Sequence, residues 1–339
     1  MNPHRPQIRK RILIGLSAIA AFLAVAVILM PTNAATSARD SRSDTLVFPD
    51  MANQLGSAKI IRVKLSDLSY TLKRAAPGSE DWVMIESGNY PVRPDRLSAL
   101  ADGLAQLKWA EPRTRDPKKL TRIGLVDPVD GGNGAYVEIL DQADTVLASL
   151  ITGRREDRLY ARLPDETKAY LMSGNLPPFY TREAWLDLKI VNMLADVVSA
   201  VRITDAAGES IYLARQPGTG PRAFRPAPPY ENERLINSLV ASGPALAIAR
   251  LAPIDVKPAA ALETRRIARH ITSTHDGLEV DVSAYREPDG FYVTLRAVEA
   301  GEGARRAETI NMRAEGWAFQ LTEFDWNEFT PPVRSIVVR

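Results

Sequence analysis

The sequence predicts an α+β fold: an N-terminal single transmembrane helix followed by a duplicated ectodomain, each copy an antiparallel sheet with a helix. Two observations lead to this prediction. Residues 12–30 are 19 consecutive residues without a charge. Beyond them, Ile61-Arg62-Val63 alternates apolar and polar residues as a half-buried strand does, and Val201-Arg202-Ile203 repeats the pattern 140 residues later.

The segment Ile12–Met30 is long enough to cross a bilayer. At about 1.5 Å per residue its 19 residues span about 28 Å as a helix, close to the ~30 Å hydrocarbon core. The preceding residues 1–11 contain four basic and no acidic side chains. The positive-inside tendency keeps such a stub in the cytoplasm. We therefore expect residues 1–11 to be cytoplasmic, residues 12–30 to form the transmembrane helix, and the remainder to be exported.

A cleaved secretory signal is the alternative interpretation of this segment. Such signals have an apolar region of only roughly 7–15 residues, followed by a small-residue cleavage site. Thr32-Asn33-Ala34 is a poor site, because Thr rather than Ala lies three residues before the cut. The length of the segment favours a retained anchor.

The composition excludes several classes of protein. The chain has no cysteine, which rules out disulfides, thiolate metal sites and cysteine nucleophiles. The formal net charge is +2, and because the stub alone holds four basic residues, the exported part is slightly acidic. Nucleic-acid binding needs a strongly basic face, so we expect no nucleic-acid partner.

The first α+β repeat is predicted to cover residues 46–196, after a flexible linker of small and polar residues at 31–45. One helix is expected, with Asp95 as its N-cap. Its apolar stripe consists of Leu97, Leu100, Leu104 and Leu107. Strands are expected at residues 61–63, 70–73, 135–140 and 145–152.

The second repeat is predicted to cover residues 197–339. Its helix is expected to carry the apolar residues Leu235, Ile236, Leu239 and Val240. Strands are expected at residues 201–203, 211–215, 267–274, 278–284 and 291–297, with turns at 275–277 and 287–290.

Short motifs occur in a fixed order along the exported part. They are Phe48-Pro49-Asp50-Met51-Ala52, Ile60-Ile61-Arg62-Val63, Trp82 with Tyr90-Pro91, residues 120–128, Val137-Glu138-Ile139-Leu140-Asp141, residues 150–155, Tyr160-Ala161-Arg162, Trp185-Leu186-Asp187 and Gly316-Trp317. Together these motifs resemble a family of bacterial envelope proteins named domain of unknown function 4340, over roughly residues 46–330.

This resemblance implies a location and a general role. Members look like single-pass or lipid-anchored envelope proteins, often encoded beside ABC-transporter subunits and gliding-motility-type auxiliary proteins. The resemblance thus implies an accessory role at a complex of the bacterial inner membrane, with the C-terminal domain in the periplasm. It brings no established catalytic residues. This chain departs from lipid-anchored members because it has no cysteine.

The sequence shows no catalytic or metal-binding set. His270 and His275 lie five residues apart on a predicted strand and turn, where surface positions are expected, whereas zinc needs three or four convergent ligands. Ser273 near His275-Asp276 lacks a nucleophile-elbow motif. Residues 127–134 are acidic and glycine-rich but fail the spacing of a calcium loop. We expect a non-enzymatic protein with no catalytic residue, metal or cofactor.

One group of arginines is a candidate contact for an anion or a partner. Guanidinium groups suit phosphate or carboxylate. Interleaved Glu156 and Asp157 instead favour a solvated face of mixed charge. The group consists of Arg154, Arg155, Arg158 and Arg162.

The leading functional hypothesis is a membrane-anchored accessory protein that binds an envelope complex, associated with an ABC transporter. Two alternatives stay open. A periplasmic hydrolase of envelope glycan or lipid would use two carboxylates about 5–9 Å apart. A lipid or small-ligand carrier would have a long apolar cavity inside the sheet. The sequence leaves the partner and the oligomeric state open.

Overall fold

The computed structural model describes residues 41–76, 78–217, 223–299 and 305–338. The predicted stub (1–11), the predicted transmembrane helix (12–30) and most of the predicted linker lie outside the described residues. Within these four ranges, no helix combines the length and the apolar character needed to cross a membrane.

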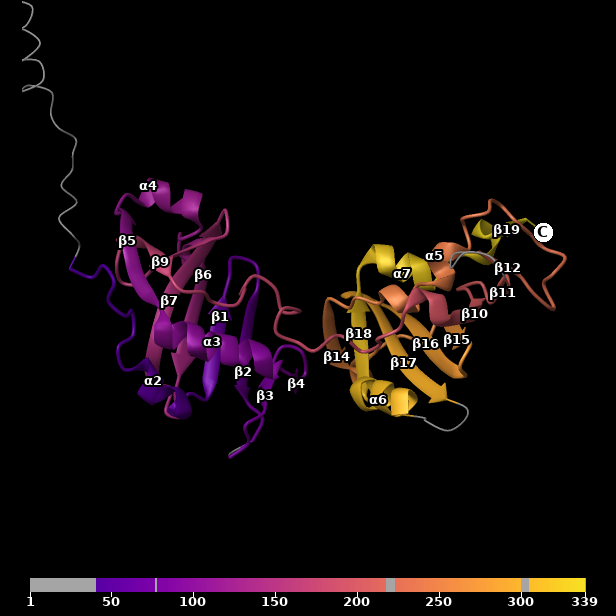
Figure 1. Cartoon of the computed structure of the whole chain (residues 1–339), viewed down its shortest axis with the longest axis horizontal. Helices are drawn as coiled ribbons and strands as arrows, with labels where there is room; N and C mark the ends of the chain where they lie inside the picture. Colours follow the sequence, from indigo (N-terminus) through magenta and orange to yellow (C-terminus); the bar gives the residue numbers. More distant parts are fainter. Residues whose placement is uncertain (1–40, 77, 218–222, 300–304, 339) are drawn as a thin grey trace, which may run out of the picture.

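Two large antiparallel sheets with few helices make this an α+β fold, which confirms that part of the prediction (Figure 1). The first sheet has nine strands in the order β4-β3-β2-β1-β6-β7-β8-β9-β5. Its strands are β1 (Ile60–Lys64), β2 (Ser69–Arg74), β3 (Trp82–Met84), β4 (Tyr90–Pro91), β5 (Lys108–Thr114), β6 (Ala135–Leu140), β7 (Val146–Arg155), β8 (Arg158–Arg162) and β9 (Ala169–Ser173). The α-helices in this part are α2 (Met51–Gln54), α3 (Pro94–Gln106) and α4 (Pro117–Leu120).

The second sheet has eight strands in the order β12-β11-β10-β15-β16-β17-β18-β14. These strands are β10 (Val198–Thr204), β11 (Ser210–Arg215), β12 (Phe224–Pro226), β14 (Asp255–Pro258), β15 (Ala268–Thr274), β16 (Leu278–Glu287), β17 (Gly290–Glu299) and β18 (Trp317–Leu321). Two short strands, β13 (Arg234–Leu235) and β19 (Val337–Val338), pair separately. The α-helices here are α5 (Ser242–Ala245), α6 (Arg305–Ala314) and α7 (Glu323–Phe329).

The two large sheets share one strand order. Strands β3, β2, β1, β6, β7, β8, β9 and β5 follow one another in the first sheet as β12, β11, β10, β15, β16, β17, β18 and β14 do in the second. The chain also visits both sets in the same sequence. Ile61-Arg62-Val63 and Val201-Arg202-Ile203 lie in the equivalent strands β1 and β10, and each pairs with the two strands that correspond.

Helix α3 forms where the leucine stripe predicts it. Leu100 and Leu104 are buried against the first sheet. The predicted N-cap is wrong. Pro94 takes the first helical position, which suits its fixed φ and missing N–H, so Asp95 falls inside the first turn. The Asp95 carboxylate accepts a hydrogen bond from Arg93 Nη2 at 2.6 Å instead.

The second predicted helix, through Leu235, Ile236 and Leu239, does not form. Leu235 belongs to β13, and the Ile236 N–H donates to the Ile336 carbonyl at 3.0 Å. Ile236 is 50% exposed and Leu239 is 72% exposed, and only Leu235 and Val240 of the predicted stripe pack against a buried cluster. Pairing with the strand β19, far away in the sequence, outweighs the local periodicity. Only the short helix α5 follows.

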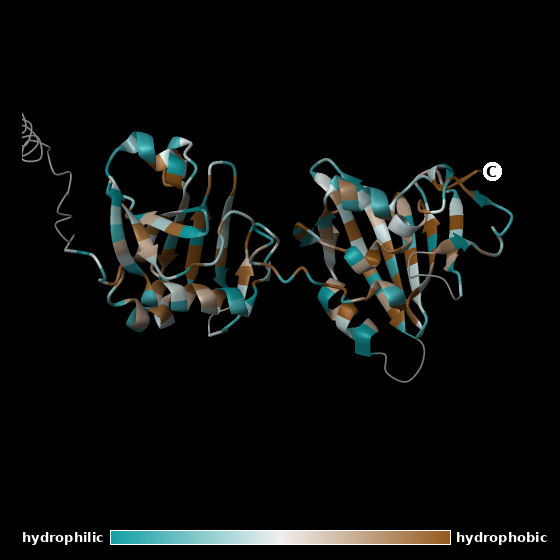
Figure 2. Cartoon of the chain, turned by 45° about the horizontal axis from the view of Figure 1, so that its top comes forward, coloured by the Kyte–Doolittle hydropathy of each residue, from teal (hydrophilic) through white to brown (hydrophobic). Residues whose placement is uncertain are grey.

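The buried cores of the protein lie against the faces of the sheets to which the apolar side chains point. Buried and more exposed residues alternate along β1 and β15, and hydrophobic and hydrophilic residues are interspersed along the strands of both sheets (Figure 2). One face of each sheet therefore holds apolar side chains, as a half-buried antiparallel sheet requires. One cluster of buried apolar residues includes members of both large sheets, such as Ile61, Val137, Val256 and Phe319.

Residues at the end of the predicted linker, and Leu46 directly after it, contact the first sheet and its loops. The Asp44 N–H donates to the Trp109 carbonyl at 2.7 Å, and Leu46 forms an isolated bridge with Lys108 of β5. Arg42 pairs with Glu166 at 2.7 Å. These contacts cover the edge strand β5, which would otherwise present free backbone groups.

Candidate functional site

The four candidate arginines lie around the hairpin of β7 and β8, but the fold does not bring them together. Arg155 pairs in register with Arg158 across the turn formed by Glu156 and Asp157. Arg154 precedes Arg155 in the strand, so its side chain leaves the opposite face of the sheet. Arg155 is exposed and lies 3.5 Å from Glu156 Oε1. Arg158 is also exposed.

Arg162 is buried, which corrects its proposed role as a contact for a ligand. Only 7% of the residue is exposed. Its Nε donates to the Leu125 carbonyl at 2.9 Å, and its Nη1 donates to the carbonyls of Pro164 and Glu166 at 2.9 and 3.0 Å. Burial lowers the pKa of this guanidinium. Arg162 thus holds a loop in place, and an anion would have to displace backbone acceptors to reach it.

Arg154 is held by the loop that follows β9. Its Nη2 donates to Asn175 Oδ1 and, at 2.6 Å, to the Leu176 carbonyl. With α3 and residues 174–178 it lines a wide hollow of about 570 Å³. Of the four arginines, Arg154 is the one that borders such a hollow.

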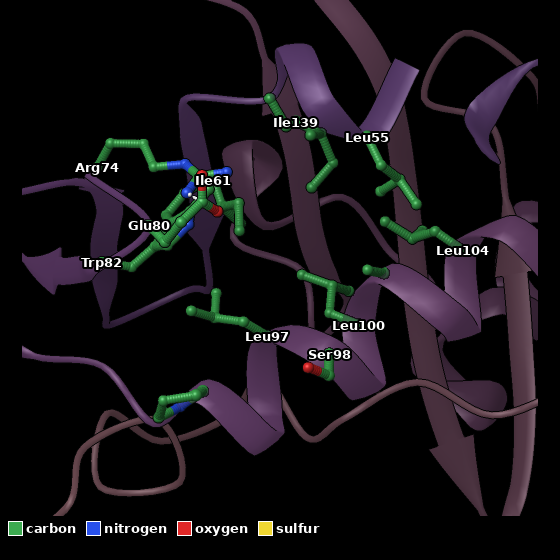
Figure 3. A pocket seen from close by; sticks show the side chains of 13 residues that line it. Leu55, Ile61, Arg74, Glu80, Trp82, Leu97, Ser98, Leu100, Leu104 and Ile139 are labelled. Carbon is green, nitrogen blue, oxygen red and sulfur yellow. Dashed lines mark hydrogen bonds and ion pairs between the residues drawn. The ribbon is translucent and has the colours of Figure 1, made fainter. Parts of the chain in front are cut away.

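A smaller and more apolar cavity of about 310 Å³ lies on the other side of α3, between this helix and the first sheet (Figure 3). Most of its lining is aliphatic, and it comes from α3, from β1, from β6 and from the segment after α2. These lining residues are Leu55, Ala58, Ile61, Pro94, Leu97, Leu100, Ala101, Leu104 and Ile139. The leucine stripe of α3 therefore forms one wall of a cavity as well as part of the core.

The charged residues of this cavity lie together at one end. Figure 3 shows Arg74, Glu80 and Trp82 at that end, with Leu55 and Leu104 opposite them. Arg74 Nη1 lies 2.7 Å from Glu80 Oε2 and donates to the Ser79 carbonyl at 3.1 Å. The Arg74 guanidinium carbon lies 5.2 Å from the centre of the Trp82 ring, within the range of a cation–π contact.

Arg74 and Glu80 differ strongly in exposure. The side chain of Arg74 is 16% exposed, whereas that of Glu80 is 91% exposed. The hydrogen bond from Arg74 lowers the pKa of the Glu80 carboxyl group. Arg74 Nε is buried and has no hydrogen-bond partner among the described residues. The cavity thus has an apolar interior and a fixed cation at one end.

No sequence pattern marks Arg74 or Trp82 as a member of a site. Arg74 ends β2 and Trp82 begins β3, and the two residues pair in register across the hairpin. The available signal was a cation directly after the predicted strand 70–73 and a tryptophan eight residues later. Because their distance from the leucine stripe depends on how α3 packs, the sequence alone does not connect them.

A second group of polar residues joins the two sheets. Ser87, in the turn between β3 and β4, contacts Asp255 of β14, and Arg182 contacts the same carboxylate. Beside them, Tyr90 packs edge-to-face against Trp317 with ring centres 4.9 Å apart. These contacts stabilise the arrangement of the two sheets.

His270 and His275 do not form a shared metal site. His270 is 1% exposed, so its predicted surface position is wrong. Its Nε2 lies 2.9 Å from the Pro244 carbonyl, and its ring packs against Phe329. His275 lies in the exposed turn after β15. Over the described ranges, no group of three or more His, Cys, Asp or Glu residues is arranged to hold a metal.

Comparison with known proteins gives one family. Searches of curated proteins and of solved structures give no match for this chain. The family model described as "Domain of unknown function (DUF4340)" matches residues 82–264. This span begins at the tryptophan beside the cavity and runs from β3 into the second sheet, so it covers more than half of the chain. The chain therefore belongs to the DUF4340 family.

Proposed function

We propose that this protein is a membrane-anchored, non-enzymatic accessory protein of the bacterial envelope, with its C-terminal domain in the periplasm. The observation that carries the proposal is the uncharged segment Ile12–Met30 behind a basic stub. Its partner would be a complex of the inner membrane, associated with an ABC transporter. Anchoring raises the local concentration of the ectodomain near such a partner.

We also propose that the ectodomain arose by internal duplication. The common strand order of the two sheets and the 140-residue spacing of β1 and β10 support this view. The copies differ at their helices, since α3 has no counterpart of similar length between β12 and β14. Such a difference lets one copy keep a cavity while the other serves packing or docking.

Exposed apolar side chains in the second repeat and just before it fit a protein partner. Leu239 is 72% exposed and Leu194 is 70% exposed. Isolated exposed leucines are common on protein surfaces. Substitution of Leu239 tests whether this side chain contributes to docking.

Topology is tested with reporters fused to the C-terminus. Alkaline phosphatase, which is active only after export, is expected to be active in the fusion, and a reporter that needs the cytosol is expected to be inactive. The opposite pattern would disprove the envelope location. The mass of the mature protein distinguishes the two interpretations of the segment. A retained anchor gives the full-length mass, whereas a cleaved signal gives a smaller protein.

The partner is tested by cross-linking in intact cells and affinity purification in a mild detergent. Subunits of a transporter or another envelope complex are expected with the wild-type protein and in reduced amount with Leu239→Ser. Val129→Ser, which changes an exposed apolar residue of the first repeat, is the matched control. Recovery of no envelope protein above background would reject the accessory role.

A further inference from the structure

We infer that the cavity between α3 and the first sheet binds a single-chain amphiphile with a terminal carboxylate, such as a medium-chain fatty acid (Figure 3). Nothing in the family description assigns a ligand. The inference also goes beyond the proposed accessory role, because it concerns a small molecule and depends only on residues of the first sheet and α3.

The interior of the cavity fits an acyl chain. Its walls are aliphatic side chains from α3 and from the central strands β1 and β6, with Leu100 and Ile139 buried. A volume of about 310 Å³ is at the lower end of ligand pockets, which run from roughly 300 to 1,000 Å³. That size suits one chain of medium length and excludes a lipid with two long chains.

The charged end fits a carboxylate. Arg74 is largely buried, lies over the Trp82 ring and already donates a hydrogen bond to a carboxylate, that of Glu80. The Glu80 side chain is 91% exposed. Its carboxylate can therefore leave Arg74 and be hydrated by water at little cost in free energy. A ligand carboxylate can then take the place of Glu80. Guanidinium binds carboxylates in a two-pronged geometry, and Arg74 Nε is a donor without a partner in the part of the chain that the structure describes.

The length of the ligand and the sign of its head group give the first test. Burying one methylene group strengthens binding about fourfold. Decanoate is therefore expected to bind about fifteenfold more tightly than octanoate. Decyltrimethylammonium has the same tail with a positive head group, and it is expected to bind at least tenfold more weakly than decanoate.

The experiment uses the full chain in lipid nanodiscs with a photoreactive decanoate that carries a diazirine at the end of its tail. Labelled peptides are mapped by mass spectrometry. Label is expected in α3 near Leu104 and in the segment that contains Leu55, at the end of the cavity opposite Arg74. Excess decanoate is expected to suppress it, and excess decyltrimethylammonium is not. Label confined to residues 12–30 would mean partition into the membrane only and would overturn the inference.

Two substitutions on α3 distinguish the cavity from the helix surface. Ala101 lines the cavity, whereas Ala99 is exposed on the other side of the helix. Ala101→Phe fills the space and is expected to reduce labelling at least tenfold, while Ala99→Phe leaves labelling unchanged. Ser98→Leu is a milder filling substitution, used if Ala101→Phe does not fold. Unchanged labelling in a folded filling variant would reject the site.

The role of the cation is tested separately. Arg74→Gln is expected to weaken decanoate binding about tenfold and not to weaken decyltrimethylammonium binding, because only the carboxylate is attracted by the charge. Arg74→Lys keeps the charge and should recover most of the affinity. Arg62→Gln, on the neighbouring strand β1, removes an exposed arginine outside the cavity and is the control. If Arg74→Gln weakened the binding of decanoate and of decyltrimethylammonium equally, Arg74 would not recognise the head group.

Discussion

Asp255 Oδ1 accepts a hydrogen bond from Ser87 Oγ at 2.8 Å, although the two residues belong to different sheets. The second oxygen of the same carboxylate lies 2.9 Å from Arg182 Nη1. Ser87 is fully buried, and the side chains of Arg182 and Asp255 are 28% and 16% exposed. One carboxylate thus connects the β3–β4 turn, the segment after the first sheet and the edge strand of the second sheet.

Asp255→Ala is expected to lower the free energy of unfolding by about 2 to 3 kcal/mol. The substitution leaves a buried hydroxyl and a largely buried guanidinium without their acceptor, and both then carry an uncompensated desolvation cost. Denaturant titration of the full chain measures the change. Asp67→Ala, at an exposed loop position, should stay within about 0.5 kcal/mol of the wild type. Equal effects of the two substitutions would show that the Asp255 contacts contribute little.

Gly88→Ala is expected to destabilise the same junction, by about 2 to 4 kcal/mol. Gly88 has a φ of +69°, and a Cβ there would overlap the Cδ of Pro258 in β14. The variant therefore combines an unfavourable backbone conformation with a clash between the two sheets. Gly208 has a similar φ of +82° but open space around its Cβ position.

Gly208→Ala is the matched control for Gly88→Ala, because it incurs only the backbone cost of about 1 kcal/mol. The difference between the two variants isolates the contact with Pro258. A smaller loss for Gly88→Ala than for Gly208→Ala would mean that the sheets do not press together at this point.

His270 is expected to make stability depend on pH between about 6.5 and 4. Burial lowers the pKa of its imidazole from 6.5 to about 4 in the folded protein. Between these values the unfolded chain binds the extra proton and the folded chain does not. Stability is therefore complete above pH 6.5 and is lost as the pH falls, by about 2 to 3 kcal/mol at pH 4.5.

Unfolding free energies at pH 7 and pH 4.5 check this prediction, with His270→Gln as the comparison. The variant should show a flatter dependence on pH. Hydrogen bonds from the backbone of Glu263 and from Thr264 lower the pKa of Glu287 to about 2, so the stability that this carboxylate contributes is lost only below about pH 4.5. The chosen interval therefore separates the two groups. An identical slope in wild type and variant would assign the effect to other residues.

Arg162→Ala is expected to cost about 3 kcal/mol of stability, since its guanidinium serves the carbonyls of Leu125, Pro164 and Glu166. Arg158→Ala, at the other end of the same strand β8, should change stability by less than about 0.5 kcal/mol. Thermal unfolding of both variants makes the comparison. A stable Arg162→Ala would return that residue to the set of available anion contacts.

The strands and helix α3 could be predicted because their patterns are local. Strand β1 alternates over Ile61, Arg62 and Val63, and the α3 stripe repeats at helical spacing, so each element shows its buried face in its own sequence. The stripe through Leu235 and Leu239 looked similar but failed, since β13 finds its partner in β19 at the far end of the chain. Periodicity indicates which face is apolar; it does not show which element covers that face.

The candidate site was largely beyond the sequence for the same reason. Arg162 and Arg158 look alike in a basic stretch, and only the loop around Leu125 makes one of them structural. His270 fits a surface strand until α5 and α7 cover it. Arg74 and Trp82 become the end of a cavity only because α3, which begins twenty residues after Arg74, packs beside them. Such packing is decided by tertiary contacts.

The apolar cluster that extends through both sheets has a practical consequence for dissecting the molecule. A cut between residues 190 and 198 would leave Tyr90 without Trp317 and would bring Ile190, which is now 2% exposed, into water. Each fragment would then expose to solvent a hydrophobic surface that is buried in the whole protein, and such surfaces commonly cause aggregation. Expression of either half by itself should yield insoluble material unless the severed surface is redesigned with polar side chains.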